Sequence, residues 1–136
     1  MRIFAFGTLK KGYALHDEGL SDAEFLGNYR TVQRFPMLIA GSWFAPMMLD
    51  APGKGLRVKG ELYNIAESKL PLLDALESVG SPGHFRKSIQ VCRDDGSETG
   101  WAFAFLKSPD LAIPVHSGYL DEYTDGRFVP PWERQK

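Results

Sequence analysis

Cysteine is almost missing from the sequence. The single cysteine among the 136 residues, Cys92, excludes a disulfide within the chain and is typical of a protein from a reducing compartment. No apolar run approaches the roughly 20 residues that a membrane-spanning helix requires. The opening stretch MRIFAF is too short for the apolar core of a signal peptide. We therefore expect a cytoplasmic protein with no membrane partner.

An excess of one charge sign is also missing. The 16 Lys and Arg residues nearly balance the 17 Asp and Glu residues, so the formal net charge is -1. Proteins that bind nucleic acid usually concentrate positive charge on one face, and no run of like charge predicts such a face here. The histidines and the cysteine lack the spacing of metal ligands. No nucleic-acid partner, metal or cofactor is predicted, and the sequence does not indicate an oligomeric state.

The apolar segments predict one α+β domain over residues 1–136. About six strands are expected, drawn from seven candidate segments, which are 2–6, 23–33, 37–40, 46–49, 56–65, 85–95 and 100–106. We expect a kink at Gly27, and the turns at 41–42 and 95–98 predict hairpins. Because strands and helices do not alternate strictly, the sheet should be compact, curved and mixed or antiparallel, forming a small barrel with one principal helix. The aromatic segment 117–136 should wrap the surface rather than extend the sheet.

One segment, residues 66–80, has the periodicity of an amphipathic helix. Asn64 or Ser68 is expected to cap its beginning, and Gly80 is expected to close its end. Pro71 is compatible with a helix only in the first turn, so the regular helix should begin near Ser68.

The stretch GTLKKG, residues 7–12, follows the first expected strand and has half of a phosphate-binding loop pattern. The next residues are Tyr13 and Ala14, where nucleotide chemistry requires Lys followed by Ser or Thr. The sequence therefore disfavours nucleotide binding. A glycine turn after a buried strand can instead present backbone N–H groups to a carboxylate or an oxyanion. The alternative, which the loop alone leaves open, is that Gly7 simply ends the strand.

Glu77 is the second candidate for a functional residue. On a helical projection it lies between Leu70 and Leu73, on the apolar stripe rather than on the polar face. It is also near the end of the expected helix, where the helix dipole disfavours negative charge. Both effects would raise the pKa of its carboxyl group, which suits a general acid or base. The alternative is that the helix frays after Leu76 and that Glu77 reaches water.

Four stretches resemble the gamma-glutamylcyclotransferase-like superfamily, in the same order along the chain. FGTLKKG resembles its Y-G-T-L-x-x-G opening, and LPLLDALES is similar to the L-D-x-x-E segment that carries its catalytic glutamate. RFPMLIAG, followed by APMMLDAPGKGLRVKGELYNI, resembles the middle of the gamma-glutamylamine cyclotransferase branch. HFRKSIQV stands where the superfamily has Y-x-R followed by a strand. The resemblance covers residues 2–106 and extends more loosely to the tail.

The resemblance implies a cofactor-independent enzyme that converts a γ-glutamyl compound into 5-oxoproline and a free amine. By position, Gly7, Thr8 and Leu9 would supply backbone donors, and Glu77 would be the catalytic acid and base. The middle segment favours a γ-glutamylamine, such as γ-glutamyl-lysine, as the substrate. The alternatives are a γ-glutamyl amino acid or dipeptide as the substrate, and non-catalytic binding of a small carboxylate on the same fold.

Three positions depart from the superfamily pattern. Phe6 and Phe85 replace the tyrosines of the two motifs, and Lys87 replaces the arginine of Y-x-R. We expect Phe6 and Phe85 at the substrate-binding site. Because the glutamate is kept, these departures bear on the choice of substrate more than on the chemistry.

Overall fold

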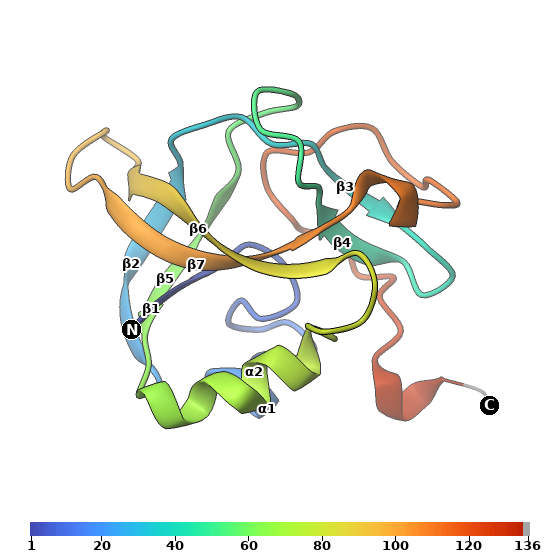
Figure 1. The fold of residues 1–136 in the computed structure, drawn as a ribbon, viewed down its shortest axis with the longest axis horizontal. Helices are drawn as coiled ribbons and strands as arrows, with labels where there is room; N and C mark the ends of the chain where they lie inside the picture. The colour runs from blue at the N-terminus through green and yellow to red at the C-terminus, as the bar shows by residue number, and fades with distance from the viewer. Residues whose placement is uncertain (135–136) are drawn as a thin grey trace.

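Five strands close into a small barrel (Figure 1). The computed structural model describes residues 1–134. Neighbouring strands pair antiparallel, except β1 and β7, which pair in parallel at Ile3 and Phe103. The mixed, barrel-forming α+β fold expected from the sequence is therefore confirmed. In their order around the barrel the strands are β1 (Arg2–Ala5), β5 (Lys59–Asn64), β2 (Glu24–Thr31), β6 (His84–Arg93) and β7 (Gly100–Lys107).

β1 is buried on both of its faces. Phe4 belongs to the cluster inside the barrel, whereas its neighbours Ile3 and Ala5 belong to a second cluster. This division follows from the alternation of side chains along a strand. The second cluster includes Leu73 of the principal helix α2 (Leu70–Leu76), which is fully buried. An uninterrupted apolar run such as RIFAF is what a strand buried on both faces requires.

The expected features of the longer strands are also confirmed. β2 is kinked where predicted, because its register with β5 shifts between Phe25 and Gly27, and Gly27 has a φ of 136°. β6 and β7 form a long hairpin across the predicted turn 95–98, with Val91 paired to Gly100.

A separate hairpin lies beside the barrel (Figure 1). Its strands are β3 (Met37–Ala40) and β4 (Ala45–Met48), and Ala40 pairs with Ala45 at the turn. The turn has left-handed backbone at both ends, with a φ of 82° at Gly41 and 53° at Phe44. The predicted hairpin is confirmed, and residues 1–134 contain seven strands rather than about six.

The helical segment 66–80 differs from the expectation at both ends. A 3-10 turn, η1 (Glu67–Lys69), precedes α2, and neither element has a side-chain cap. Asn64 does not cap because its side chain accepts a hydrogen bond from the N-terminal ammonium, and Ser68 lies inside η1. Gly80 does not close the helix, because Ser78 already takes left-handed backbone with a φ of 58°. Pro71 is in the first turn of α2, as expected.

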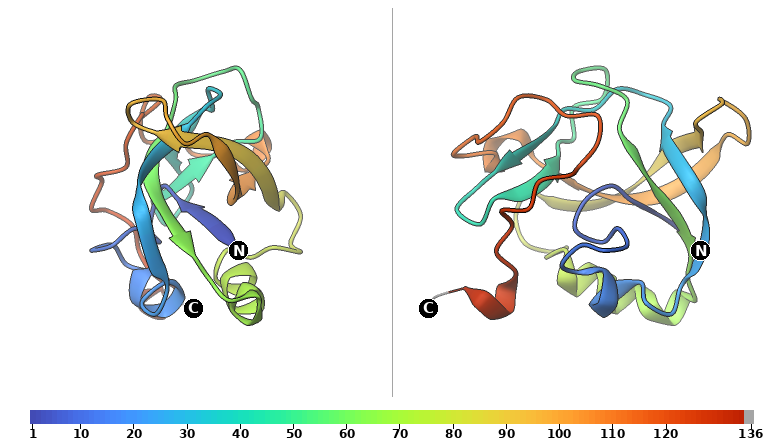
Figure 2. Two further views of the ribbon diagram at one scale, coloured as in Figure 1. Left: turned by 90° about the vertical axis from the view of Figure 1, so that its left-hand side faces the viewer. Right: turned by 180° about the vertical axis from the view of Figure 1, so that it is seen from behind.

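Two helices and the C-terminal segment flank the barrel. The short helix α1 (His16–Gly19) lies side by side with α2 beneath the barrel (Figure 2). After β7 the chain makes a 3-10 turn η2 (Pro109–Leu111) and then follows the surface to a last one, η3 (Pro131–Glu133). Residues 117–134 add no strand to the barrel, as predicted, and residues 135 and 136 of the predicted segment lie outside the described residues. No helix within residues 1–134 has the length and apolar character to cross a membrane.

Candidate active site

The loop after β1 leaves a row of backbone donors unused. The turns in the loop are closed by hydrogen bonds from the Lys10 N–H to the Gly7 carbonyl (3.0 Å) and from the Leu15 N–H to the Thr8 carbonyl (2.9 Å). Within residues 1–134, the backbone N–H groups of Gly7, Thr8 and Leu9 donate no hydrogen bond to a protein group. Thr8 and Leu9 are nevertheless buried. Buried N–H groups are rarely left unpaired, so these donors are available to a ligand atom.

Two anchors fix the position of this loop. A Cβ atom added to Gly7 would lie 2.7 Å from Cγ of Pro46 in β4, so only glycine fits there. At the other end of the loop, the buried Lys10 ammonium donates to the Tyr123 carbonyl at 2.8 Å. The donors are therefore held in place before any ligand arrives.

Glu77 occupies the position immediately after α2. Its backbone N–H donates to the Leu73 carbonyl at 3.0 Å, and the chain then turns sharply at Ser78. Burial of the Glu77 carboxyl group raises its pKa, and the positive charge of Lys107 partly opposes this shift. The helix does end at Leu76, as one alternative supposed, yet the carboxyl group stays out of bulk water.

The loop donors and the glutamate face one another across a small cavity. This cavity, of about 20 Å³, is lined by Gly7, Thr8, Leu9 and Glu77, together with Phe6 and other apolar residues. Its volume suits a single water molecule or one oxygen atom of a ligand. The sequence singled out the loop and the glutamate separately, and the fold brings them together.

A larger cavity adjoins the small one. It has a volume of about 590 Å³, and Thr8, Pro46 and Glu77 border both spaces. One wall is formed by Leu72, Ala75 and Leu76 of α2, and the others by the β3–β4 turn, β6, β7 and the C-terminal segment. Cavities of this volume hold small organic ligands.

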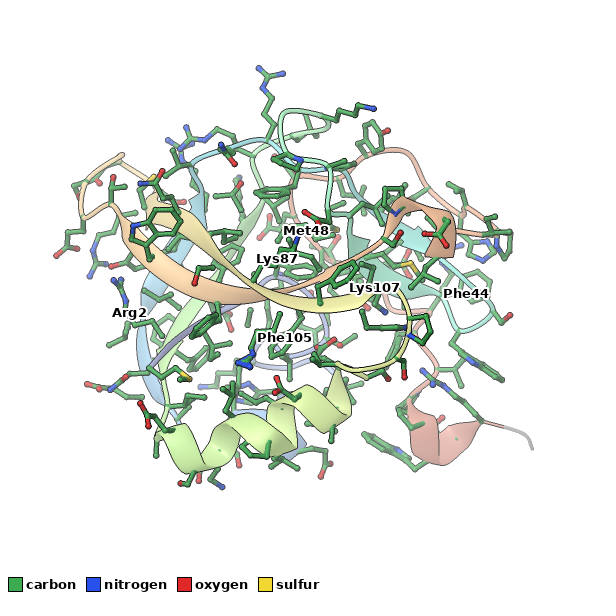
Figure 3. The ribbon with its side chains drawn as sticks, viewed as in Figure 1. Arg2, Phe44, Met48, Lys87, Phe105 and Lys107 are labelled. Carbon is green, nitrogen blue, oxygen red and sulfur yellow. The ribbon has the colours of Figure 1, made fainter. Side chains whose placement is uncertain are left out.

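His84 on β6 and Lys107 on β7 form a cross-strand pair, and both line the larger cavity. Burial lowers the pKa of Lys107, and the negative charge of Glu77 opposes this. Burial and the charge of Lys107 also lower the pKa of His84. Figure 3 shows Phe105 between β7 and α2, and Lys107 further along β7 toward the β3–β4 hairpin.

The two phenylalanines expected at the site are placed differently. Phe6 lines the small cavity. Phe85 lines neither cavity and is 37% exposed. The reason is the alternation of β6, which turns His84 toward the cavity and its neighbour Phe85 outward.

Sequence reasoning missed the basic residues of the larger cavity, which are His84, Lys107 and Arg134. Lys107 follows the apolar run GWAFAFL, and a cation is common where a strand ends near solvent. Arg134 lies in the tail, more than 50 residues from Glu77 along the chain. No local pattern relates these positions, because only the closure of the barrel and the path of the tail place them around one space.

Comparison with known proteins gives a consistent result. Residues 3–124 match the family model described as gamma-glutamyl cyclotransferase, AIG2-like. The chain is 41% identical to a gamma-glutamylaminecyclotransferase of Mus musculus and 39% identical to that of Homo sapiens, and each match covers 98% of both chains. It is 33% identical to gamma-glutamylaminecyclotransferase B of Danio rerio, over 86% of this chain and 66% of that protein.

Solved structures agree with the family match. A crystal structure of an AIG2-like protein from Mus musculus superposes with a TM-score of 0.83 at 31% identity, covering 98% of this chain and 97% of that one. A structure named gamma-glutamyl cyclotransferase shares the fold, with a TM-score of 0.63 at 21% identity over 79% of this chain and 66% of that one. The chain therefore belongs to the gamma-glutamyl cyclotransferase, AIG2-like family of enzymes.

Proposed function

We propose that the protein is a γ-glutamylamine cyclotransferase, which cleaves a γ-glutamyl amide such as γ-glutamyl-lysine into 5-oxoproline and a free amine. The observation that carries this proposal is the placement of Glu77 and the unused N–H groups of Gly7, Thr8 and Leu9 around one small cavity. The names of the mouse and human relatives, which match over nearly the whole chain, favour an amine over an amino acid as the leaving group.

The reaction is an intramolecular substitution at the side-chain amide carbon of the glutamyl group. The α-amino nitrogen forms a bond to this carbon, a five-membered ring closes, and the bond to the leaving nitrogen breaks. Glu77 accepts the proton that the α-ammonium must lose before the attack, and then delivers it to the leaving nitrogen. The ring nitrogen loses a second proton once its bond to carbon has formed, and the released amine takes up this proton and departs as an ammonium ion. Nucleophile and electrophile belong to one molecule, so the protein mainly holds the substrate in a folded shape, an effect worth about 7–11 kcal/mol when alignment is good.

The small cavity suits the oxygen on which negative charge develops. Its volume of about 20 Å³ suits one oxygen atom. We take this oxygen to be the oxyanion, whose charge the Gly7–Leu9 donors would stabilise. In a studied hydrolase, loss of one such donor costs about 2.7–4 kcal/mol, which sets the scale of the effect.

The raised pKa of Glu77 fits the role of a proton carrier. An ordinary glutamate, with a pKa of about 4.3, is a weak base near neutrality. Burial raises the pKa of Glu77 and makes its carboxylate a stronger base, while the Lys107 charge limits this rise.

A substrate panel tests the proposed function. The protein is incubated with γ-glutamyl-ε-lysine, a γ-glutamyl alkylamine and a γ-glutamyl dipeptide, and 5-oxoproline is measured by mass spectrometry. We expect product from the amine compounds at a higher rate than from the dipeptide. The opposite preference would identify a dipeptide cyclotransferase. Tight binding of 5-oxoproline without any turnover would identify a binding module and would contradict the proposal.

Replacing Lys107 by methionine is expected to shift the acidic limb of the pH profile of kcat/KM to higher pH. Lys107 lowers the pKa of Glu77, so its removal raises that pKa further. Because Glu77 must be ionised to accept a proton, a higher pH is then needed for full activity. The matched control is Lys87→Met, since Lys87 lies on β6, pairs with Asp50 and lines neither cavity. An unchanged limb in Lys107→Met would remove Lys107 from the electrostatics of the site.

A further inference from the structure

Arg134 forms a basic part of the larger cavity that the proposed chemistry does not use. It is half-buried, and its Nε donates to the Val129 carbonyl at 3.0 Å. Its guanidinium carbon lies 5.1 Å from the ring centre of Trp43 and 5.6 Å from that of Phe128. The Val129 N–H in turn donates to the Trp43 carbonyl at 3.0 Å, which ties the C-terminal segment to the β3–β4 turn. The guanidinium is therefore held at the cavity wall rather than free in solvent.

The charges around this cavity are unbalanced. Within residues 1–134, neither Arg134 nor Lys107 has a carboxylate oxygen within 4.0 Å of its side-chain nitrogens. Burial lowers the pKa of Lys107, and the positive charge of Arg134 adds to this effect. Glu77 is the only acidic residue among those of the described chain that line it. An anionic group of a ligand would be stabilised there, whereas a second ammonium group would find no partner.

We propose that Arg134 is a specificity-determining residue that binds a carboxylate carried by the leaving amine, an inference that rests on the proposed function. The reacting amide belongs near Thr8, Pro46 and Glu77, which border both cavities. From there the leaving amine extends into the larger cavity. Arg134 lines the larger cavity but not the small one. The favoured leaving groups therefore have a carboxylate at one end and, at the other end, the amine that is joined to the glutamyl group. A second amino group can be present or absent.

A series of three substrates isolates the carboxylate. γ-Glutamyl-6-aminohexanoate carries a terminal carboxylate on a five-carbon chain, γ-glutamyl-pentylamine has the same chain without it, and γ-glutamyl-cadaverine carries an ammonium group instead. We expect the wild-type kcat/KM for the first compound to exceed that for the other two by on the order of tenfold, the scale of one charge-assisted hydrogen bond at a partly exposed site. The difference should lie in KM.

Arg134→Met is the informative variant, because the methionine keeps an apolar stem over Trp43. It should abolish the preference for the carboxylate, and Arg134→Lys should retain part of it. The matched control is Arg127→Met. Arg127 lies on the same C-terminal segment, stacks on Phe44 at 4.9 Å and pairs with Asp125, but does not line the cavity. It should leave the preference unchanged.

A binding measurement separates this inference from the proposed function. N-acetyl-6-aminohexanoate is titrated into each variant, and its dissociation constant is measured by NMR. We expect binding to weaken about tenfold in Arg134→Met and to stay unchanged in Arg127→Met, the scale again being one charge-assisted hydrogen bond. If wild type forms no 5-oxoproline, the proposed function fails, and this titration alone decides whether Arg134 binds a carboxylate.

Two results would overturn the assignment. If Arg134→Met keeps the carboxylate preference and the wild-type affinity for N-acetyl-6-aminohexanoate, Arg134 does not bind that group. If the variant loses activity equally with all three substrates, Arg134 contacts the glutamyl part that they share rather than the leaving amine.

Discussion

Replacing Glu77 by glutamine is expected to abolish nearly all 5-oxoproline formation while leaving the fold intact. Glutamine has almost the same shape but cannot accept the proton of the α-ammonium. Proton transfer by a positioned group typically contributes about 10²–10⁴-fold to the rate, so a loss of that size in kcat/KM is expected. The measurement is 5-oxoproline release from γ-glutamyl-ε-lysine at saturating and subsaturating substrate.

The matched control for this variant is Glu67→Gln. Glu67 is the exposed first residue of η1 and lines neither of the two cavities at the candidate site. Its replacement should leave the rate unchanged. Turnover within a few-fold of wild type in Glu77→Gln would remove the glutamate from the mechanism, and the proton would then need another carrier.

The stability of Glu77→Gln should depend on pH in a defined direction. Burial raises the pKa of Glu77 in the folded protein above its unfolded value, so its favourable contribution is fully present below the unfolded pKa and is lost as pH rises through the folded pKa. Glutamine does not ionise, so the variant does not have this loss of stability as pH rises. The melting temperature of the variant relative to wild type should therefore rise between pH 4 and pH 8, and a fall would contradict the burial of the carboxyl group.

Replacing Gly7 by alanine is expected to produce the second large effect, a loss of about 10²–10³-fold in kcat, the scale of one lost oxyanion donor. The new Cβ atom would lie 2.7 Å from Cγ of Pro46, a rigid ring in β4, so the loop or the strand must move. Overpacking of this kind also costs about 1–3 kcal/mol of stability. Activity with γ-glutamyl-ε-lysine and the free energy of unfolding are the two measurements.

A second substitution in β4 distinguishes misplacement of the loop from general damage. Pro46→Ala removes the Cγ atom and leaves the nearest contact to Cβ at 3.2 Å, so Gly7→Ala should cost less activity in the Pro46→Ala background than in wild type. Gly118→Ala is the control, because no atom lies within 4 Å of its added Cβ. Wild-type activity in Gly7→Ala would show that the position of the loop donors does not matter for catalysis.

Helical periodicity predicts part of the position of Glu77, but not all of it. The spacing of Leu70 and Leu73 predicts that the carboxylate lies on the apolar side of the helix, and the raised pKa agrees with this. Periodicity does not predict that the helix ends one residue before the glutamate. The left-handed backbone at Ser78 turns the chain there, and a non-glycine residue in that conformation depends on tertiary contacts.

The C-terminal segment shows the opposite case. Its composition predicts that it covers the surface without extending the sheet. Residues 117–134 add no strand to the barrel, but Tyr123 is buried in the cluster inside it. The composition does not predict which surface it covers. The Val129–Trp43 hydrogen bond and the stacking of Arg134 on Trp43 join parts of the chain more than 80 residues apart, and no short sequence pattern encodes such a contact.

The sequence by itself determined the fold class, the β3–β4 and β6–β7 hairpins, and the two elements that carry the candidate chemistry. These follow from local rules, because alternation, helical periodicity and glycine turns act over a few residues. Only the tertiary structure decided that the Gly7 loop and Glu77 share the small cavity, and that His84, Lys107 and Arg134, but not Phe85, line the larger cavity beside it. Those relations arise when the barrel closes, because closure brings together residues that are too far apart along the chain for local interactions to place.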